Sequence, residues 1–239
     1  MTRPSFLAEQ RAVVTGASSG IGRAVAREML AMGTRVALIG RDQMRLEEAA
    51  EGYSEHLLLT CDVRDDNQVR ATVTRVEQAW DGVDLLVNSA GLYQTAPLTE
   101  TSNAMWDDLW RTNVSGTLFP TRAVLPGMLE RGHGTIVMIS SVAGYRGFAN
   151  NTAYAATKLA VTGLARSLSD EVRRKGVRVV NATIGPVDTP VWAGSGTPLE
   201  REDMLTPEET AQAIINAISV SKTQVLEEIV LLPQKGLYH

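Results

Sequence analysis

The feature that most constrains the fold is a series of short apolar runs, rich in β-branched residues, that alternate with stretches of helical character. Most runs are apolar throughout, which is typical of strands that are covered on both faces of a sheet. They lie at 11–15, 34–40, 56–61, 83–90, 134–140, 177–184 and 227–232. Strand–helix alternation at this spacing favours right-handed crossovers, so we predict an α/β fold: a doubly wound parallel sheet of about seven strands with helices on both faces.

Two segments between these runs carry strong helix-start signals. Asp65–Gln68 resembles a capping box, with an acidic N-cap and a glutamine three residues later. Thr206–Glu209 offers an N-cap threonine, a proline at the first helical position and glutamate in the first turn. No linker, repeat or low-complexity segment divides the 239 residues. We therefore expect a single domain over 1–239.

Composition excludes several classes of partner. The net charge is −4 and no basic stripe is present, which argues against nucleic acid and against an anionic membrane surface. No run reaches the ~18 apolar residues of a membrane span, and the first residues lack the apolar core of a signal peptide. The single cysteine, Cys61, excludes an internal disulfide and fits a reducing cytoplasm. We expect a cytoplasmic protein with no nucleic-acid or membrane partner, and no metal site, because the acidic residues form no ligand cluster.

A glycine-rich turn follows the first predicted strand and opens a helix. Gly16, Gly20 and Gly22 have the spacing GxxxGxG, which differs from the common GxGxxG of dinucleotide-binding proteins. The physics is the same: glycines permit a tight turn, and the helix N-terminus favours phosphate charge. A glycine cluster alone is as typical of a structural turn, but its place directly after the first strand favours a dinucleotide site.

The end of the second predicted strand bears on the choice of cofactor. Gly40 occupies the position where an NAD-binding fold usually presents a carboxylate to the ribose, and Arg41 follows it. An arginine there suits a 2′-phosphate, although an isolated loop arginine is usually only solvated. Asp42 either caps the next helix or competes for the ribose. NADP(H) is the favoured cofactor and NAD(H) the alternative.

Tyr154 and Lys158 stand at i and i+4 of a predicted helix and so share one face. Alone, such a pair is more often an ordinary helix contact. Lowering a tyrosine pKa by three units needs about 4 kcal/mol. A unit charge at ~4 Å supplies about that at an effective dielectric constant of ~20. The pair can therefore bring a tyrosine into working range as an acid or base.

Taken together, the pattern resembles the compact branch of the short-chain dehydrogenase/reductase family. The resemblance runs over nearly the whole chain and is specific because the motifs occur in the family's order and spacing. They are Thr15–Gly22 (TGASSGIG), Asp62, Asn88–Gly91 (NSAG, where the family more often has NNAG), Asn113, Ser141 and Tyr154-x-x-x-Lys158.

The resemblance implies a Rossmann-type fold, hydride transfer between a nicotinamide and a small alcohol or carbonyl compound, and a homo-oligomer, either a dimer or a tetramer. It makes Tyr154 the general acid/base, and Lys158 the group that binds the nicotinamide ribose and lowers the tyrosine pKa. Ser141 binds the substrate oxygen, and Asn113 holds a water that continues the proton relay. With Arg41 from the argument above, the expected cofactor contacts are Gly16, Ser18, Ser19, Gly20, Ile21, Gly22, Arg41, Asp62, Val63, Asn88, Ala90, Gly91, Tyr154, Lys158, Val187 and Thr189.

One departure from the family pattern follows the sixth predicted strand. Ile184-Gly185-Pro186 replaces the usual Pro-Gly step, which leaves the backbone contacts of Val187 open, whereas Thr189 still matches the family's cofactor-binding threonine. We expect a substrate lid at 190–206, in which Trp192 and Met204 either face the substrate or pack against the lid's own helix. Residues near 92–98, 142–150 and 185–206 are expected to shape the substrate pocket.

Three functions fit this pattern to different degrees. The favoured one is a carbonyl reductase or alcohol dehydrogenase. A protein of the same fold that senses cofactor without turnover is the alternative, although such proteins often lose one of Asn113, Ser141, Tyr154 and Lys158. A sugar-nucleotide epimerase or dehydratase shares the Tyr–Lys chemistry, but those chains are typically longer and differ in glycine spacing.

Overall fold

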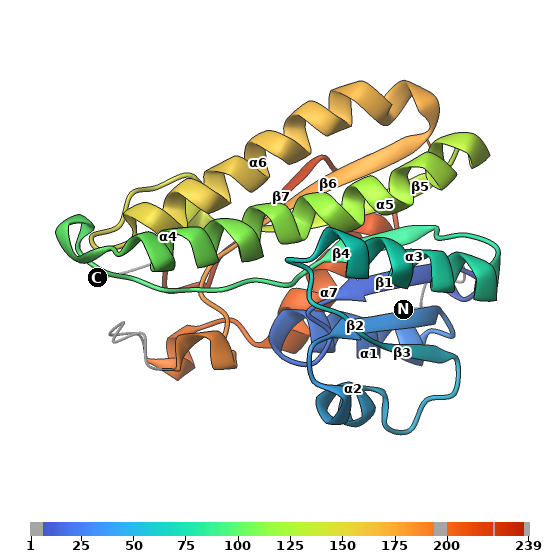
Figure 1. Cartoon of the computed structure of the whole chain (residues 1–239), viewed down its shortest axis with the longest axis horizontal. Helices are drawn as coiled ribbons and strands as arrows, with labels where there is room; N and C mark the ends of the chain where they lie inside the picture. Colours follow the sequence, from blue (N-terminus) through green and yellow to red (C-terminus); the bar gives the residue numbers. More distant parts are fainter. Residues whose placement is uncertain (1–6, 194–199, 222, 237–239) are drawn as a thin grey trace.

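The computed structural model describes residues 7–193, 200–221 and 223–236. Within them, each predicted apolar run contains a strand, and the strands form one sheet in which all neighbours are parallel. Their order across the sheet is β3-β2-β1-β4-β5-β6-β7 (Figure 1). The strands are β1 Arg11–Thr15, β2 Arg35–Gly40, β3 His56–Thr60, β4 Leu85–Asn88, β5 Gly134–Ser141, β6 Val177–Ile184 and β7 Glu228–Leu231. The predicted doubly wound parallel sheet is confirmed.

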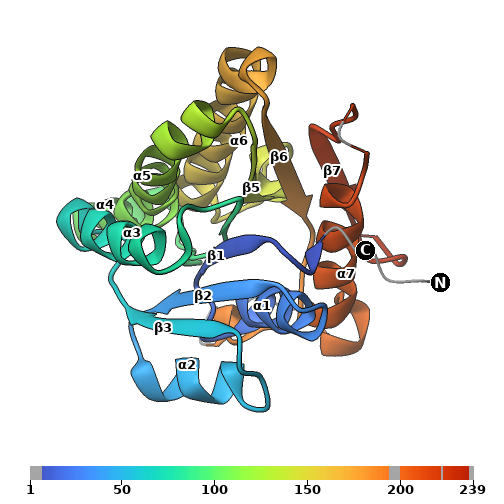
Figure 2. The same ribbon diagram turned by 90° about the vertical axis from the view of Figure 1, so that its right-hand side faces the viewer.

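Helices cover both faces of this sheet (Figure 2). Helices α1, α2 and α7 pack on one face, and α3, α5 and α6 pack on the other. A π-helical turn, Trp110–Ser115, joins α4 to α5, which the sequence analysis did not predict. The helices are α1 Gly20–Ala31, α2 Gln43–Ala50, α3 Asp66–Trp80, α4 Asn103–Leu109, α5 Gly116–Arg131, α6 Thr152–Val172 and α7 Pro207–Ile218.

Alternate residues of the central strands enter opposite cores. In β1, Ala12 and Val14 belong to the core under α1 and α7, whereas Val13 belongs to the core under α3, α5 and α6. Successive side chains of a strand point to opposite faces, and here both faces are covered by helices. Every position in such a strand can therefore be apolar, which accounts for the unbroken apolar runs of the sequence.

The two expected helix starts form, but with different side-chain hydrogen bonds. At α7, Thr206 and Glu209 make a reciprocal capping box. At α3, the Asp65 side chain accepts hydrogen bonds from backbone N–H groups of the first turn. Gln68 Oε1, however, accepts from the backbone N–H of Asp62 at 3.0 Å rather than from that of the N-cap. Gln68 thereby ties the start of α3 to the residue that follows β3 by two positions.

The strand order reverses between β1 and β4. From β1 the chain continues to β2 and β3 on one side, and β4 to β7 lie on the other side. Thr15 and Asn88, the last residues of β1 and β4, are paired in register at this point. Ligands of doubly wound sheets bind in the crevice beyond the carboxyl ends of the strands at such a reversal. The fold therefore directs the search for a site to this edge.

Candidate active site

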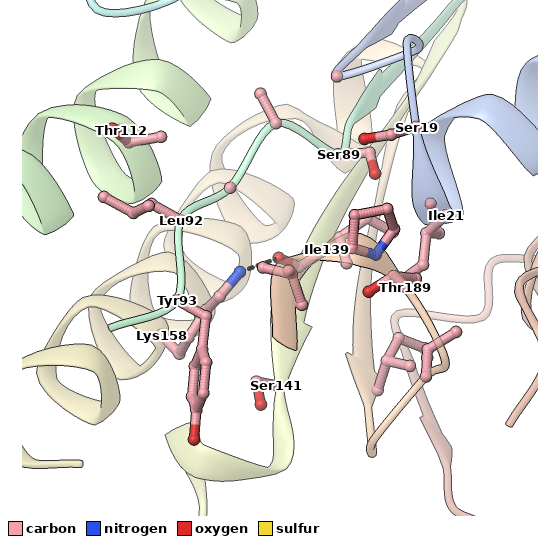
Figure 3. Close-up of a pocket in the computed structure, with 18 of the residues that line it drawn as sticks. Ser19, Ile21, Ser89, Leu92, Tyr93, Thr112, Ile139, Ser141, Lys158 and Thr189 are labelled. Carbon is pink, nitrogen blue, oxygen red and sulfur yellow. Dashed lines mark hydrogen bonds between the residues drawn. The ribbon is translucent and has the colours of Figure 1, made fainter. Parts of the chain in front are cut away.

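A cavity lies beyond the carboxyl ends of β1 and β4, where the strand order reverses. Ser19, Ile21 and Thr189 occupy one end of it, and Tyr93 and Ser141 lie toward the other (Figure 3). Most of the predicted site residues line it: Gly16, Ser18, Ser19, Gly20, Ile21, Arg41, Asp62, Val63, Ala90, Gly91, Ser141, Tyr154, Lys158, Val187 and Thr189. Three predicted residues, Gly22, Asn88 and Asn113, are instead buried behind its wall.

The start of α1 offers backbone N–H groups to this cavity. Ser19 caps the helix in an extended conformation without a side-chain hydrogen bond, and the first turn contains no acidic residue. Gly20 has a φ of +53°, and a Cβ on it would lie 3.0 Å from Thr189 Cγ2. Free N–H groups at the positive end of a helix favour phosphate. The glycine turn therefore fits the pyrophosphate of a dinucleotide.

Two further glycines let the helix start approach the sheet closely. Gly16 has a φ of +67°, and a Cβ there would lie 2.8 Å from the backbone of Ala90. A Cβ on Gly22 would collide with the carbonyl oxygen of Gly16. In addition, Thr15 Oγ1 accepts hydrogen bonds from the N–H groups of Ser89 and Ala90, at 3.1 and 3.2 Å. The turn after β1 and the turn after β4 are thus fixed side by side.

The two predicted asparagines, Asn88 and Asn113, form hydrogen bonds behind the residues that line the cavity. Asn88 Nδ2 donates to Thr121 Oγ1 at 3.0 Å. Asn113, in the π-helical turn, accepts from the N–H of Leu92 at 2.7 Å and donates from Nδ2 to the Leu92 carbonyl at 3.0 Å. The same Nδ2 donates to Thr157 Oγ1 in α6 at 3.0 Å. The Asn113 side chain therefore holds the turn after β4 against α6, and its role in holding a relay water stays a prediction.

A charged cluster lines the end of the cavity beyond β2 and β3. Arg41 follows β2, and Arg64 Nη2 lies 2.7 Å from Asp62 Oδ2. The hydrogen bonds from Arg64 are the main cause of the lowered pKa of the Asp62 carboxyl, to which the charge of Arg41 adds. Asp42 is engaged as the N-cap of α2, where it accepts from the N–H of Arg45 at 3.2 Å. Of the two roles considered for Asp42, the structure shows the cap.

Tyr154 and Lys158 project from α6 into the cavity beside Ser141, the last residue of β5. Lys158 is only 7% exposed, and its Nζ donates to the carbonyl of Ile139 at 2.9 Å (Figure 3). This nitrogen lies 5.8 Å from the centroid of the Tyr154 ring. The neighbouring Ser140 is buried, with its Oγ donating to the Lys158 carbonyl at 3.0 Å. Ser141, rather than Ser140, is therefore the serine suited to bind a substrate oxygen.

Burial shifts the pKa values of the two α6 groups in opposite directions. Burial raises the pKa of the Tyr154 phenol because it disfavours the phenolate, hydrogen bonding with Ser141 lowers it, and the nearby Tyr93 raises it further. Burial lowers the pKa of Lys158 to about 8. Here the effect of burial outweighs the hydrogen bond with Ser141, and a lowering of the tyrosine pKa by Lys158 stays a prediction. At neutral pH the phenol therefore carries its proton.

The three ranges expected to shape the substrate pocket each contribute an aromatic side chain to the cavity. These are Tyr93, Phe148 and Trp192. Trp192 and Met204 were each expected either to face the substrate or to pack against the lid's own helix. Trp192 lines the cavity, whereas the described side chain of Met204 does not. Residues 194–199 of the expected lid lie outside the described residues.

Sequence reasoning missed Arg64 as a site residue. The available signal was its position, two residues after Asp62 in the loop that follows a strand, where doubly wound sheets place ligand contacts. The segment after the departure at Ile184–Pro186 still reaches the cavity. Gly185 donates its N–H to the Leu231 carbonyl at 2.8 Å, and Val187 and Thr189 both line the cavity.

Two other kinds of feature bear on function. In the described parts of the chain, no helix has both the length and the apolar composition needed to cross a membrane. Among the same residues, no group of three or more His, Cys, Asp or Glu side chains is placed to hold a metal ion.

The doubly wound sheet, the glycine turn and the cavity at the strand reversal define a dinucleotide-binding class of protein. A family model described as short chain dehydrogenase matches residues 10–199. An uncharacterized oxidoreductase of Staphylococcus saprophyticus is 34% identical over 232 residues, which cover 95% of this chain and 98% of that protein. The chain belongs to the short-chain dehydrogenase/reductase family of oxidoreductases.

Two similar solved structures are complexes with an NADP compound. A serine dehydrogenase in its closed form with NADP+ matches with a TM-score of 0.87 and 28% identity, covering 95% of this chain and 96% of that one. An alcohol dehydrogenase from the archaeon Thermococcus sibiricus, complexed with 5-hydroxy-NADP, matches with a TM-score of 0.87 and 29% identity. That match covers 96% of this chain and 99% of the other.

Proposed function

We propose that this protein is an NADP(H)-preferring oxidoreductase that interconverts a small carbonyl compound and its alcohol, as a carbonyl reductase or alcohol dehydrogenase does. The observation that carries the proposal is that Tyr154, Ser141 and Lys158 line the same cavity as the start of α1. The start of α1 fits the pyrophosphate, and a bound nicotinamide supplies or accepts the hydride. NAD(H) is the alternative cofactor.

Tyr154 is the general acid in the direction of reduction. Its raised pKa keeps the phenol protonated at neutral pH. The phenol donates this proton to the substrate oxygen as the carbonyl carbon gains a hydride, so the carbonyl becomes an alcohol and the dinucleotide is oxidised. Ser141 donates a hydrogen bond to the same oxygen and stabilises the negative charge that develops on it.

Lys158 supports the reverse direction, in which Tyr154 must accept a proton. With a pKa of about 8, the amine is mostly charged at neutral pH. Its Nζ lies 5.8 Å from the centroid of the Tyr154 ring, and a positive charge this close favours the phenolate over the neutral phenol. This interaction opposes the effect of burial on the phenol. The water held by Asn113 in the family's relay would then return the proton to solvent.

Preference for NADP(H) is assigned to the charged cluster of Arg41, Asp62 and Arg64, at the end of the cavity beyond β2 and β3, which we assign to the adenine half of the cofactor and call the adenine end. Gly40 presents no carboxylate to repel a 2′-phosphate, and Asp42 is occupied as the cap of α2. Arg41 and Arg64 both line this end and offer two guanidinium groups to the phosphate, which such planar groups bind well. The NADP compounds bound by the two similar structures also support this preference.

The remaining features of the proposal concern the whole chain. We assign it to one domain over 1–239 with a substrate lid at 190–206, to the cytoplasm, and to a homo-oligomer. Cys61, a free and buried cysteine, is compatible with a reducing compartment. The homo-oligomer rests on the family resemblance alone.

A turnover assay with purified protein tests the proposal. Consumption of NADPH and of NADH is followed with a panel of ketones and aldehydes, and binding of each cofactor is measured separately. We expect turnover of at least one carbonyl compound, with a higher kcat/KM for NADPH than for NADH. Cofactor binding without turnover of any carbonyl or alcohol would instead support a cofactor-sensing protein and contradict the enzymatic proposal.

A further inference from the structure

An aromatic wall stands next to the reacting hydroxyl. The ring of Tyr93 meets the ring of Tyr154 edge to face, with centroids 4.8 Å apart and an interplanar angle of 87°. On its other side, Tyr93 contacts Trp192, again with centroids 4.8 Å apart, at 60°. Aromatic pairs favour such edge and tilted arrangements at these distances. A substrate whose oxygen reaches Tyr154 therefore lies beside two aromatic rings.

Hydrogen bonds fix the indole of Trp192 and the backbone that precedes Tyr93. Trp192 Nε1 donates to the carbonyl of Val187 at 2.7 Å, so the indole has its polar group satisfied by backbone. The backbone of Leu92, which precedes Tyr93, is bound at its N–H and at its carbonyl by Asn113. A wall positioned before the substrate arrives loses little conformational entropy on binding.

Apart from Lys158, the charged side chains that line the cavity lie at the end beyond β2 and β3. Among the described residues that line it, the charged ones are Arg41, Asp62 and Arg64 at the adenine end, and Lys158. Lys158 is buried and donates to the Ile139 carbonyl. Residues 194–199, outside the described part, contain no ionisable side chain in the sequence GSGTPL. A carboxylate or phosphate on the substrate would therefore meet no arginine beside the aromatic wall among the described residues that line the cavity.

We propose that the substrate end accepts uncharged carbonyl compounds that carry an aromatic ring, and that Tyr93 and Trp192 are specificity-determining residues. This inference rests on the proposed function and names the substrate class of that site. The ring lies against Tyr93 and Trp192 while the carbonyl oxygen reaches Tyr154 and Ser141. A negative charge on the substrate is rejected because it would be desolvated without a partner.

A matched pair of ketones tests the charge selectivity. Methyl 4-acetylbenzoate and 4-acetylbenzoate present the same aryl ketone with an ester or a carboxylate at the far side of the ring. With saturating NADPH, we expect kcat/KM for the ester to exceed that for the carboxylate by about a hundredfold, since an unpaired buried charge is costly. Equal or faster reduction of the carboxylate would overturn the inference but leave the proposed function standing.

Variants test the aromatic wall, with binding as a readout that does not depend on turnover. Trp192→Leu and Tyr93→Leu should each weaken binding of the ester to the NADP+-saturated protein by about three- to tenfold, measured by calorimetry. They should raise KM more than they lower kcat, and Trp192→Phe should restore most of the affinity. Trp106→Leu, at a tryptophan that is 38% exposed and outside the cavity, is the matched control.

The possible outcomes separate the two proposals. Unchanged ester affinity in both leucine variants, with each variant folded, contradicts the role of the aromatic wall. Failure of the wild type to reduce any carbonyl compound contradicts the proposed function itself. If only aliphatic ketones or keto acids are reduced, the proposed function stands and the inferred substrate class is wrong.

Discussion

The two ends of the cavity differ in the means by which they can discriminate between ligands. At the adenine end, Arg41, Asp62 and Arg64 are accessible charged groups, and the side chains of Asp62 and Arg64 are 25% and 36% exposed. At the substrate end, Tyr93 and Trp192 form an uncharged wall beside the partly buried Tyr154. Charge can therefore select the cofactor, whereas shape and the cost of desolvation select the substrate. Each end should respond to a different kind of substitution.

The largest effect should follow from removing one oxygen at the substrate end. Tyr154→Phe keeps the ring but cannot transfer a proton, so kcat for carbonyl reduction should fall by at least ~10²-fold. The dissociation constant for NADPH should change little, since the adenine end is untouched. Steady-state kinetics and calorimetry measure the two quantities. Tyr145→Phe, at an exposed tyrosine outside the cavity, is the control, and near-normal turnover by folded Tyr154→Phe would disprove the assignment.

The cost of burying a cation gives the second prediction. The pKa of Lys158 is about 8 in the folded protein and ~10.4 in an unfolded chain, so the folded state binds fewer protons between these values. The stability of the wild type should therefore rise with pH across this window, by an amount on the order of 3 kcal/mol at ~1.36 kcal/mol per unit.

Lys158→Met removes the titrating group and should remove this dependence. The free energy of unfolding is measured with urea at pH 7 and at pH 10. Relative to wild type, the variant should be more stable at pH 7 than at pH 10, because only at pH 7 is the wild-type amine buried with its charge. Lys175→Met, at an exposed lysine, should show no such difference. A stability difference between Lys158→Met and wild type that is the same at both pH values would contradict the account.

At the adenine end, Arg41→Ala should change cofactor choice without changing the chemistry. A hydrogen bond to a charged group contributes roughly 1.5–3 kcal/mol, so NADPH should bind about ten- to a hundredfold more weakly. NADH should be nearly unaffected, because it lacks the 2′-phosphate. Arg45→Ala, one turn away on α2, is the matched control. Equal losses of affinity for NADPH and NADH would show that Arg41 does not bind the 2′-phosphate.

A substitution at Gly40 is a poorer test of cofactor choice than one at Arg41, because Gly40 is closely packed. A Cβ on Gly40 would lie 3.2 Å from Leu46 Cδ2 and 3.3 Å from Ser18 Oγ. A new carboxylate there would disturb the core under α2 as well as repel phosphate. A Gly40→Asp variant would therefore confound the two effects, which Arg41→Ala separates.

The smallest effect is expected from Arg64→Ala. Arg64 is held by Asp62 at 2.7 Å and lies 3.7 Å from Asp108, so much of its charge is already compensated. Its removal should lower the affinity for NADPH by about two- to fivefold, less than the loss expected for Arg41→Ala. Titration of both variants with NADPH checks this ranking. A larger loss for Arg64→Ala would make Arg64 the principal phosphate contact.

The contrast between the two ends also explains what could be predicted from the sequence. The apolar runs and Gly16, Gly20 and Gly22 were sufficient for the fold and the glycine turn, because covered strands and close backbone approach each demand particular residue types. Tyr154 and Lys158 could be placed on one helix face because helical periodicity fixes their spacing.

Other features depend on contacts between segments that are distant in the chain, so the sequence alone could not predict them. The raised pKa of Tyr154 follows from its burial, which no spacing reveals. Gln68 could cap its own helix or bind the backbone of Asp62, and only the fold decides between these bonds. The contact between Tyr93 and Trp192 joins residues 99 positions apart in the chain, from two loops whose course a single sequence does not determine.

Transfer of label from deuterated cofactor tests the central claim most directly. NADPH carrying deuterium at both hydrogen positions of the reactive nicotinamide carbon is incubated with an aryl ketone and either wild type or Tyr154→Phe, and the alcohol is examined by mass spectrometry and NMR. The account predicts deuterium on the alcohol carbon with wild type, and at least ~10²-fold slower labelling with the variant. No labelled alcohol from any carbonyl compound, or equal rates of labelling by the two proteins, would contradict it.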